Sequence, residues 1–159
     1  MKQIILNVCI IFIFGCNSTG NPEKIWEQIE DYRVKKDLQN AITKCKLILS
    51  EFPNDKIASM ALFQIGDIYL NDVQDYDFAI QYFSEVVEKY PESKESEKAA
   101  FMIGYIYANN LDSYSDAAEY YKIFLNKYPA SELIHSVKYE LQVLEPLLIE
   151  IDSLNSNLE

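Results

Sequence analysis

Residues 75–93 read DYDFAIQYFSEVVEKYPES, and similar stretches lie at one fixed interval before and after them. The preceding stretch, 37–55, reads DLQNAITKCKLILSEFPND, and the following one, 113–131, reads SYSDAAEYYKIFLNKYPAS. Pro53, Pro91 and Pro129 are therefore equally spaced, and we call their spacing the repeat interval. Each stretch begins with a residue that can cap a helix, continues with apolar residues at helical spacing, and ends in an aromatic residue followed by proline. This regularity is typical of an array of stacked supersecondary units.

A second helix follows each proline. Two residues beyond the proline stands another possible cap, which is Asp55, Ser93 or Ser131 in the successive copies. Apolar residues at helical spacing come next, with Gly66 and Gly104 at the same place in two copies. Glycine in a helix interior is about 1 kcal/mol less favourable than alanine. The repeated glycine therefore indicates that two helices cross closely at this position.

These patterns predict an all-α fold: a right-handed α-solenoid of about three helix hairpins plus a C-terminal capping helix, seven helices in all. The first helix is expected to begin at Pro22 with Asn21 as its cap. The last is expected over residues 131–153, where it shields the final repeat. No long strand-like alternation of apolar and polar residues interrupts the helical spacing.

The first fifteen residues have a different composition. Lys2 precedes an apolar run over residues 4–14, which is too short to span a bilayer but has the length of a signal-peptide core. The run ends in Ile13-Phe14-Gly15-Cys16, which resembles the lipobox of bacterial lipoproteins. The resemblance implies a signal peptide over residues 1–15, lipidated Cys16, and a polar tether over residues 16–21. An ordinary secretory signal or a membrane anchor with a chance cysteine is the alternative.

Lipidation would attach the protein to a lipid bilayer through acyl chains on Cys16. Asn17 is not the aspartate that is associated with inner-membrane retention, so the resemblance favours the outer membrane, facing the periplasm. Loss of the leader and lipidation of Cys16 leave Cys45 without a partner for a disulfide. Cys45 stands at the repeat position of Phe83 and Tyr121 and is expected to be a small buried hydrophobic residue, with a reactive or intermolecular thiol as the alternative.

Composition excludes several functions. The formal net charge is −11, which disfavours nucleic acid and anionic lipid headgroups as partners. Four glycines provide no phosphate-binding loop, and a single histidine, His135, provides no zinc or Cys–His catalytic set. The acidic turns lack the twelve-residue calcium loop. We therefore expect no enzymatic activity, no metal and no small-molecule cofactor.

The arrangement resembles the tetratricopeptide repeat family over residues 22–150. The matching positions are Gly66, Tyr69, Ala79, Phe83 and Pro91, and again Gly104, Tyr107, Ala117, Tyr121 and Pro129. The usual unit has about 34 residues. The longer unit of this chain is similar to that of envelope proteins of Gram-negative bacteria. These include the lipoprotein of the β-barrel assembly machinery and the periplasmic Tol–Pal-associated repeat protein. The resemblance predicts a repeat domain over residues 22–154 and a frayed tail over residues 155–159.

In stacked hairpins the first helix of each pair lines the concave side, where partners bind. The predicted groove positions are Phe63, Gln64, Asp67, Asn71, Phe101, Met102, Tyr105 and Asn109. This aromatic and amide lining suits an extended peptide or a docked helix. Phe63 and Phe101 could instead close the core. Repeat domains that clamp a C-terminal carboxylate use basic residues, and those are absent from these positions.

The sequence thus favours a non-catalytic adaptor that binds other envelope proteins or peptides. The resemblance implies that the protein is anchored to the bacterial outer membrane and takes part in outer-membrane protein assembly. A cell-envelope or division coordinator of the Tol–Pal-associated type is one alternative. A ligand-binding or hydrolytic lipoprotein on a repeat scaffold is the other, and it would need a convergent polar pocket.

Overall fold

The computed structural model describes residues 20–156, which form seven α-helices and one π-helical turn and contain no strand. The helices are α1 (Pro22–Val34), α2 (Leu38–Glu51), α3 (Lys56–Ile68), α4 (Tyr76–Lys89), α5 (Lys94–Asn109), α6 (Tyr114–Lys127) and α7 (Ile134–Ser156). The π-helical turn η1 (Tyr69–Val73) extends α3. Three hairpins followed by a single closing helix confirm the predicted all-α solenoid. The lipobox and Cys16 lie outside the described residues.

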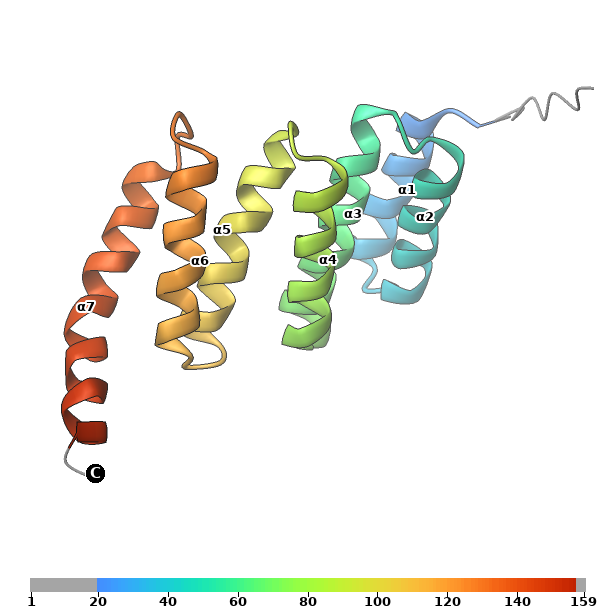
Figure 1. The fold of residues 1–159 in the computed structure, drawn as a ribbon. Coiled ribbons are helices and arrows are strands. Elements are labelled where there is room, and N and C mark those ends of the chain that lie inside the picture. The colour runs from blue at the N-terminus through green and yellow to red at the C-terminus, as the bar shows by residue number, and fades with distance from the viewer. Residues whose placement is uncertain (1–19, 157–159) are drawn as a thin grey trace, which may run out of the picture.

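The hairpins stack side by side into two layers, with α1, α3 and α5 in one layer and α2, α4 and α6 in the other (Figure 1). Every helix packs on the next along the chain. In addition α1 contacts α3 and α3 contacts α5, whereas the helices of the other layer approach one another less closely. The array therefore curves toward the layer of α1, α3 and α5, which forms the concave face.

The predicted caps begin the helices. The Asn21 side chain accepts from the backbone N–H groups of residues 23 and 24, and Asp55 and Ser93 accept in the same way at α3 and α5. Asp37 and Asp75 do so at α2 and α4. Ser113 precedes α6 but bonds the Asp116 carboxylate instead of a backbone amide. Because α2, α4 and α6 end directly before the aromatic–proline pairs, the predicted stops are also confirmed.

The closing helix differs from its prediction at both ends. It begins at Ile134 rather than near Ser131, whose hydroxyl accepts from the Leu133 backbone N–H at 3.2 Å in a preceding turn. It runs through Pro146 and ends at Ser156, so part of the expected tail is helical. Residues 157–159 lie outside the described part of the chain.

The two repeated glycines lie where the helices of a hairpin cross. A Cβ atom added to Gly66 would stand 2.8 Å from the Phe83 ring, and one added to Gly104 would stand 2.6 Å from the Tyr121 ring. Both rings are fully buried. The glycines therefore occupy equivalent environments, as their equal phase predicted, and each allows an aromatic ring of α4 or α6 to lie against the backbone of the preceding helix.

In the first hairpin, the residues of α1 are shifted by one position relative to the repeat interval. The backbone N–H groups of Asp37, Asp75 and Ser113 donate to the carbonyls of Tyr32, Tyr69 and Tyr107, at 2.9, 2.9 and 2.8 Å. These tyrosines are thus equivalent, yet the first two stand one position closer together than the second and third. The first hairpin lacks the additional residue that the later turns contain. The repeat interval therefore fails in α1, and Ile29 occupies the glycine position there.

In the first hairpin, the residue opposite the large Ile29 is small. Ile29 and Cys45 are both fully buried in the same core cluster, and Cys45 holds the position of Phe83 and Tyr121. A large residue on α1 faces a small one on α2, where the later hairpins pair glycine with an aromatic ring. Burial raises the pKa of the Cys45 thiol to about 12, so it stays protonated near neutral pH. The predicted buried, hydrophobic role is confirmed.

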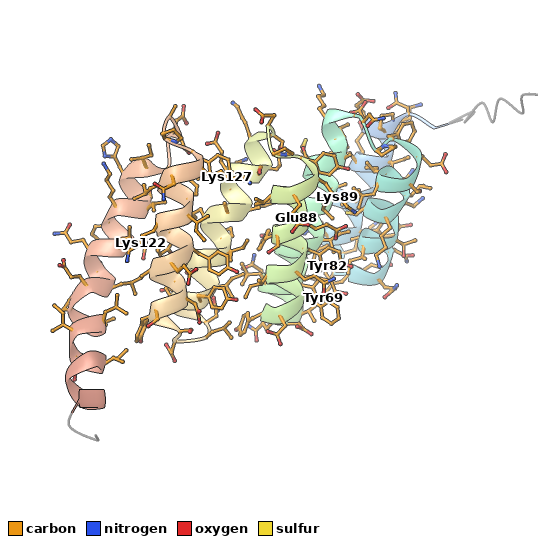
Figure 2. All side chains as sticks on the ribbon, in the orientation of Figure 1. Tyr69, Tyr82, Glu88, Lys89, Lys122 and Lys127 are labelled. Carbon is orange, nitrogen blue, oxygen red and sulfur yellow. The ribbon has the colours of Figure 1, made fainter. Side chains whose placement is uncertain are left out.

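Stacked tyrosines close each later hairpin near its turn. The rings of Tyr69 and Tyr82 lie side by side with centroids 5.4 Å apart (Figure 2). Tyr107 and Tyr120 repeat the arrangement at 5.1 Å in the next hairpin, one repeat interval further on. Such pairs add about 0.5–1.5 kcal/mol beyond the burial of their area. They fix the end of the hairpin that is opposite the proline turns.

We predict that Cys45→Phe destabilises the protein by about 1–3 kcal/mol, because the ring would meet Ile29 where the later hairpins have glycine. Ile29→Gly combined with Cys45→Phe recreates the pair of the second hairpin. The double variant should therefore be more stable than the sum of the two single changes implies. Urea unfolding followed by far-UV circular dichroism measures all four proteins. Simple additivity would contradict the size matching.

Candidate functional site

An aromatic side chain stands at the same place on the first helix of every unit. The register that aligns the turn tyrosines also aligns Trp26, Phe63 and Phe101, and the next repeat interval reaches Tyr139 on α7. Phe63 and Phe101 are half-buried, with ring centroids 5.0 Å and 5.8 Å from Phe83 and Tyr121. Both rings thus pack on the core from the first helix of their hairpin. Tyr139, with no following helix in the described residues, is 64% exposed.

The junction between the first and second hairpins is closed by ion pairs. Arg33 on α1 donates to the Asp67 carboxylate at 2.8 Å and lies 3.5 Å from Asp72. Asn71 donates to the same Asp67 carboxylate at 2.7 Å, and Gln64 lies near it at 3.4 Å. Three predicted groove residues thus form one network. Asp67 is thus ion-paired within the chain.

Asp72 holds the outer end of this network. Its side chain is 10% exposed and accepts from the Lys36 ammonium at 2.6 Å. The Lys36 hydrogen bond, opposed by burial and assisted by Arg33, holds the pKa of the Asp72 carboxyl below its usual value. The pair joins the turn of the first hairpin to η1 of the second. It therefore fixes the relative position of two neighbouring repeats.

The junction between the second and third hairpins is open. A cavity of about 360 Å³ lies there between η1, the start of α4 and the concave side of α5. Its walls contain no charged side chain and are formed by Leu70, Asn71, Gln74, Tyr76, Phe101, Met102, Tyr105 and Asn110. Four of the predicted groove residues meet here: Asn71, Phe101, Met102 and Tyr105. Amide groups beside aromatic and aliphatic surface suit an uncharged peptide segment.

Asn109 and Phe63 do not line this cavity. Asn109 is exposed and donates to the backbone carbonyl of Tyr105 at 3.0 Å. Its neighbour Asn110 does line the cavity, and the Asn110 side-chain oxygen is buried with no hydrogen-bond partner among the described residues. An unsatisfied acceptor is unfavourable by about 1–3 kcal/mol.

Sequence reasoning missed four lining residues because they belong to turns and helix ends: Leu70, Gln74, Tyr76 and Asn110. The signal for the turn existed: Lys36, Gln74 and Asp112 are spaced by the repeat interval, and all three have positive φ. The π-helical turn was not visible in the sequence. It adds a residue before Gln74 and thereby turns Leu70 and Asn71 toward α5.

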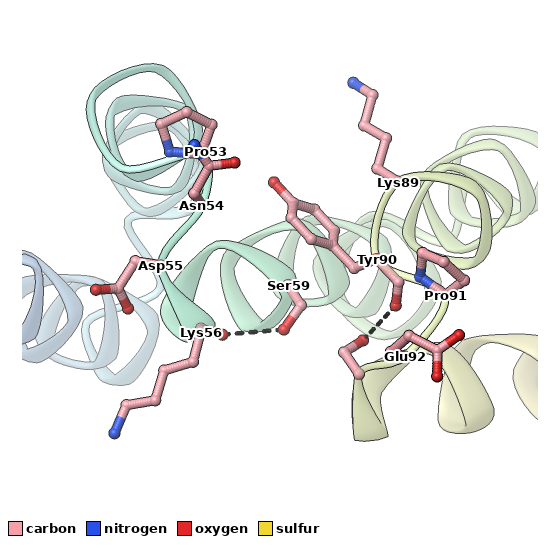
Figure 3. Close-up of a pocket in the computed structure, with 10 residues that line it drawn as sticks. Pro53, Asn54, Asp55, Lys56, Ser59, Lys89, Tyr90, Pro91 and Glu92 are labelled. Atoms are coloured by element: carbon pink, nitrogen blue, oxygen red, sulfur yellow. Dashed lines mark hydrogen bonds between the residues drawn. The ribbon is translucent and has the colours of Figure 1, made fainter.

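Another cavity, of about 650 Å³, lies at the edge of the array between two proline turns (Figure 3). Ser59 and Ser93 bond local backbone carbonyls within it, at 3.0 and 2.8 Å. A smaller cavity of about 300 Å³ recurs at the next pair of turns. Because this space repeats wherever two such turns stack, we attribute it to the spacing of the hairpins.

Two further observations concern residues 20–156. No three His, Cys, Asp or Glu side chains gather there in a way that could hold a metal ion. None of the helices in this part of the chain combines the length and the apolar character needed to cross a bilayer.

Helical hairpins stacked with a continuous concave face define an α-helical repeat protein. Residues 60–93 and 98–131, which lie in the second and third hairpins, match the family model of the tetratricopeptide repeat. Repeats of this kind are typically non-catalytic modules that bind other proteins. A search of the curated proteins found no match.

We predict that Lys36→Met lowers stability at pH 7 and that it lowers stability less at pH 3. The folded pKa of Asp72 is depressed, so its contribution is present above the unfolded value of about 3.9 and is lost as the pH falls through the folded value. The loss at pH 7 should stay below about 1 kcal/mol, because Lys36 is largely exposed.

Urea midpoints at the two pH values measure this difference. The control is Lys35→Met, which removes the exposed ion pair between Lys35 and Asp31 at the end of α1. An equal loss from Lys36→Met at both pH values would contradict a role through the charge of Asp72.

Proposed function

We propose that this chain is a non-catalytic adaptor, anchored to the bacterial outer membrane through Cys16, that binds other envelope proteins on its concave face. In this proposal, the adaptor takes part in outer-membrane protein assembly. The observation that carries the proposal is the combination of a lipobox-like stretch at residues 13–16 with an array that contains tetratricopeptide repeats. A lipid anchor and an interaction module are the two parts that such an adaptor requires.

The partner's chemistry in this proposal comes from the open junction. The cavity between the second and third hairpins offers amide and aromatic groups and no charge. An extended peptide can pair its backbone with Asn71 and Asn110 while an uncharged side chain rests on Phe101. The ion pairs of Arg33 with Asp67 and Asp72 stiffen the preceding junction. A stiff platform beside the cavity reduces the entropy lost on binding.

We predict that Cys16→Ser abolishes incorporation of radiolabelled palmitate and releases the protein from the membrane fraction, because acyl chains provide the anchor. The matched control is Cys45→Ser, which leaves the lipobox intact. Immunoblots of fractionated cells and autoradiography give the readout. Membrane association that persists in Cys16→Ser would contradict the lipid anchor.

We predict that Tyr105→Ala reduces the recovery of envelope partners about tenfold, since Tyr105 lines the cavity and is 37% exposed. Ile123→Ala removes a 49% exposed apolar residue from the opposite layer and should leave recovery unchanged. Partners are compared by quantitative mass spectrometry after crosslinking in intact cells. Identical partner lists from both variants and the wild type would contradict the concave site.

The assigned process has its own test. Depletion of the protein should reduce insertion of outer-membrane porins before any change in septation. A septation defect with normal porin insertion would instead support the division-coordinator alternative.

A further inference from the structure

The last helix of the array is uncovered on the side where every earlier counterpart is covered. Helix α2 packs on α1, α4 on α3 and α6 on α5. In the same register, Leu141 and Gln142 of α7 correspond to Ile103 and Gly104 of α5. Gly104 is the point at which α6 crosses. Among residues 20–156, no helix follows α7 to cover the corresponding surface.

The chain does not turn back here because the turn residues are missing. Each earlier hairpin turn has a residue of positive φ followed by an Asp or Ser at the N-cap position of the next helix, as at Asp112 and Ser113. One repeat interval further on, the chain has Glu150 and Ile151. Isoleucine cannot cap a helix. Helix α7 therefore continues for 23 residues, against 13 to 16 residues in the other α-helices.

A groove marks the uncovered surface. It has a volume of about 410 Å³ and lies between α6 and α7. Its apolar lining comes from Ala118 on α6 and from Leu141, Leu148 and Ile149 on α7. Ile149 is 64% exposed. Lys122, which Figure 2 labels on α6, and Glu145 on α7 place one opposite charge on each wall.

The repeat itself defines the shape that fits this groove. Glycine on the first helix of a hairpin faces an aromatic ring in the second and third units, whereas Ile29 in the first unit goes with the small Cys45. Gln142 is a large residue at that position and lines the groove. A helix that covers α7 must therefore bring a small residue to Gln142. Its flanks should carry an acidic group toward Lys122 and a basic group toward Glu145.

We propose that this end of the solenoid binds an amphipathic α-helix of a partner protein, which lies on α7 as α6 lies on α5 and presents a small residue to Gln142. The site is separate from the concave face and does not depend on the proposed membrane anchor. It continues the helix-on-helix interface that the hairpins already form. A partner helix would thus complete a fourth hairpin.

A second copy of this chain fits the groove less well. Helices α2, α4 and α6 bury their apolar faces within their own array. The opposite end of a second array would present α1, whose exposed residues include Glu23, Glu27 and Glu30. Placing these carboxylates against the apolar Leu148 and Ile149 would remove them from water, which is unfavourable for charged groups. The chemistry therefore favours a different protein that carries a helix with an apolar face.

The chain's own second helix supplies a matched pair of probes. A peptide of residues 37–52 carries the face that packs on a large residue, and Cys45→Ala and Cys45→Phe versions differ at the position that would meet Gln142. Fluorescence anisotropy measures the binding of each labelled peptide to the full chain in detergent. We expect the alanine version to bind at least about tenfold more tightly than the phenylalanine version.

Substitution of Gln142 should invert the preference. Gln142→Gly recreates the glycine position of α5 and should favour the phenylalanine peptide, and Gln142→Ala should shift the ratio in the same direction without placing glycine in a helix. Leu148→Glu should abolish binding of the alanine peptide. Leu47→Glu in the full chain is a matched change at an exposed leucine on α2 and should leave binding of the alanine peptide unchanged.

Equal affinities of the two peptides, or no binding at about 1 mM, would overturn the proposal. So would a preference that does not respond to Gln142. Sedimentation of the full chain tests the remaining occupant: a dimer that Leu148→Glu dissociates would assign the groove to a second copy and would also overturn it. None of these outcomes bears on Cys16 or on Tyr105, so the proposed function stands or fails separately.

Discussion

The closeness of the two helices within each hairpin is the constraint on which the rest of the array depends. Phe83 and Tyr121 can lie against the preceding helix only because Gly66 and Gly104 carry no Cβ atom. This contact sets the separation and the crossing of the hairpin's helices. Because protein interiors are close-packed, the same spacing can be kept only by exchanging volume across the interface. The first hairpin does this with Ile29 and Cys45.

The elements of the fold could be predicted from the sequence because their signals are local. Caps such as Asp75, stops such as Pro91 and the glycines at the crossing each act through their own backbone or nearest contacts. The register of α1 could not be predicted in this way. That register depends on whether the turn after α1 contains the additional residue that the later turns contain. Only the hydrogen bonds from the cap residues to Tyr32 and Tyr69 show that these two tyrosines are equivalent. Periodicity is informative about copies of a unit and uninformative about a unit that departs from it.

The outline of the candidate site could also be predicted, because it follows from local helix geometry. The prediction was incomplete, because contacts between repeats are not local. Asn71, Phe101, Met102 and Tyr105 follow from the concave side of a helix, and they do line one cavity. Asp67 follows from the same rule, yet its charge is neutralised by Arg33 from the preceding hairpin. Contacts between repeats involve residues far apart in the chain, and a repeating pattern does not specify them. Each junction therefore has its own chemistry on an identical backbone plan, which is how a repeat array acquires specificity.

The two ends of the array are also unequal, and this bears on how an anchored molecule would stand. The proposed tether leads directly into α1, where Glu23, Glu27 and Glu30 are exposed. Lys24, Lys35 and Lys36 are exposed at the same end, so the charges there are mixed. Under the proposed anchorage, α7 would be the end of the array furthest from the tether. In that orientation the concave cavity and the groove beside Gln142 would both lie away from the point of attachment.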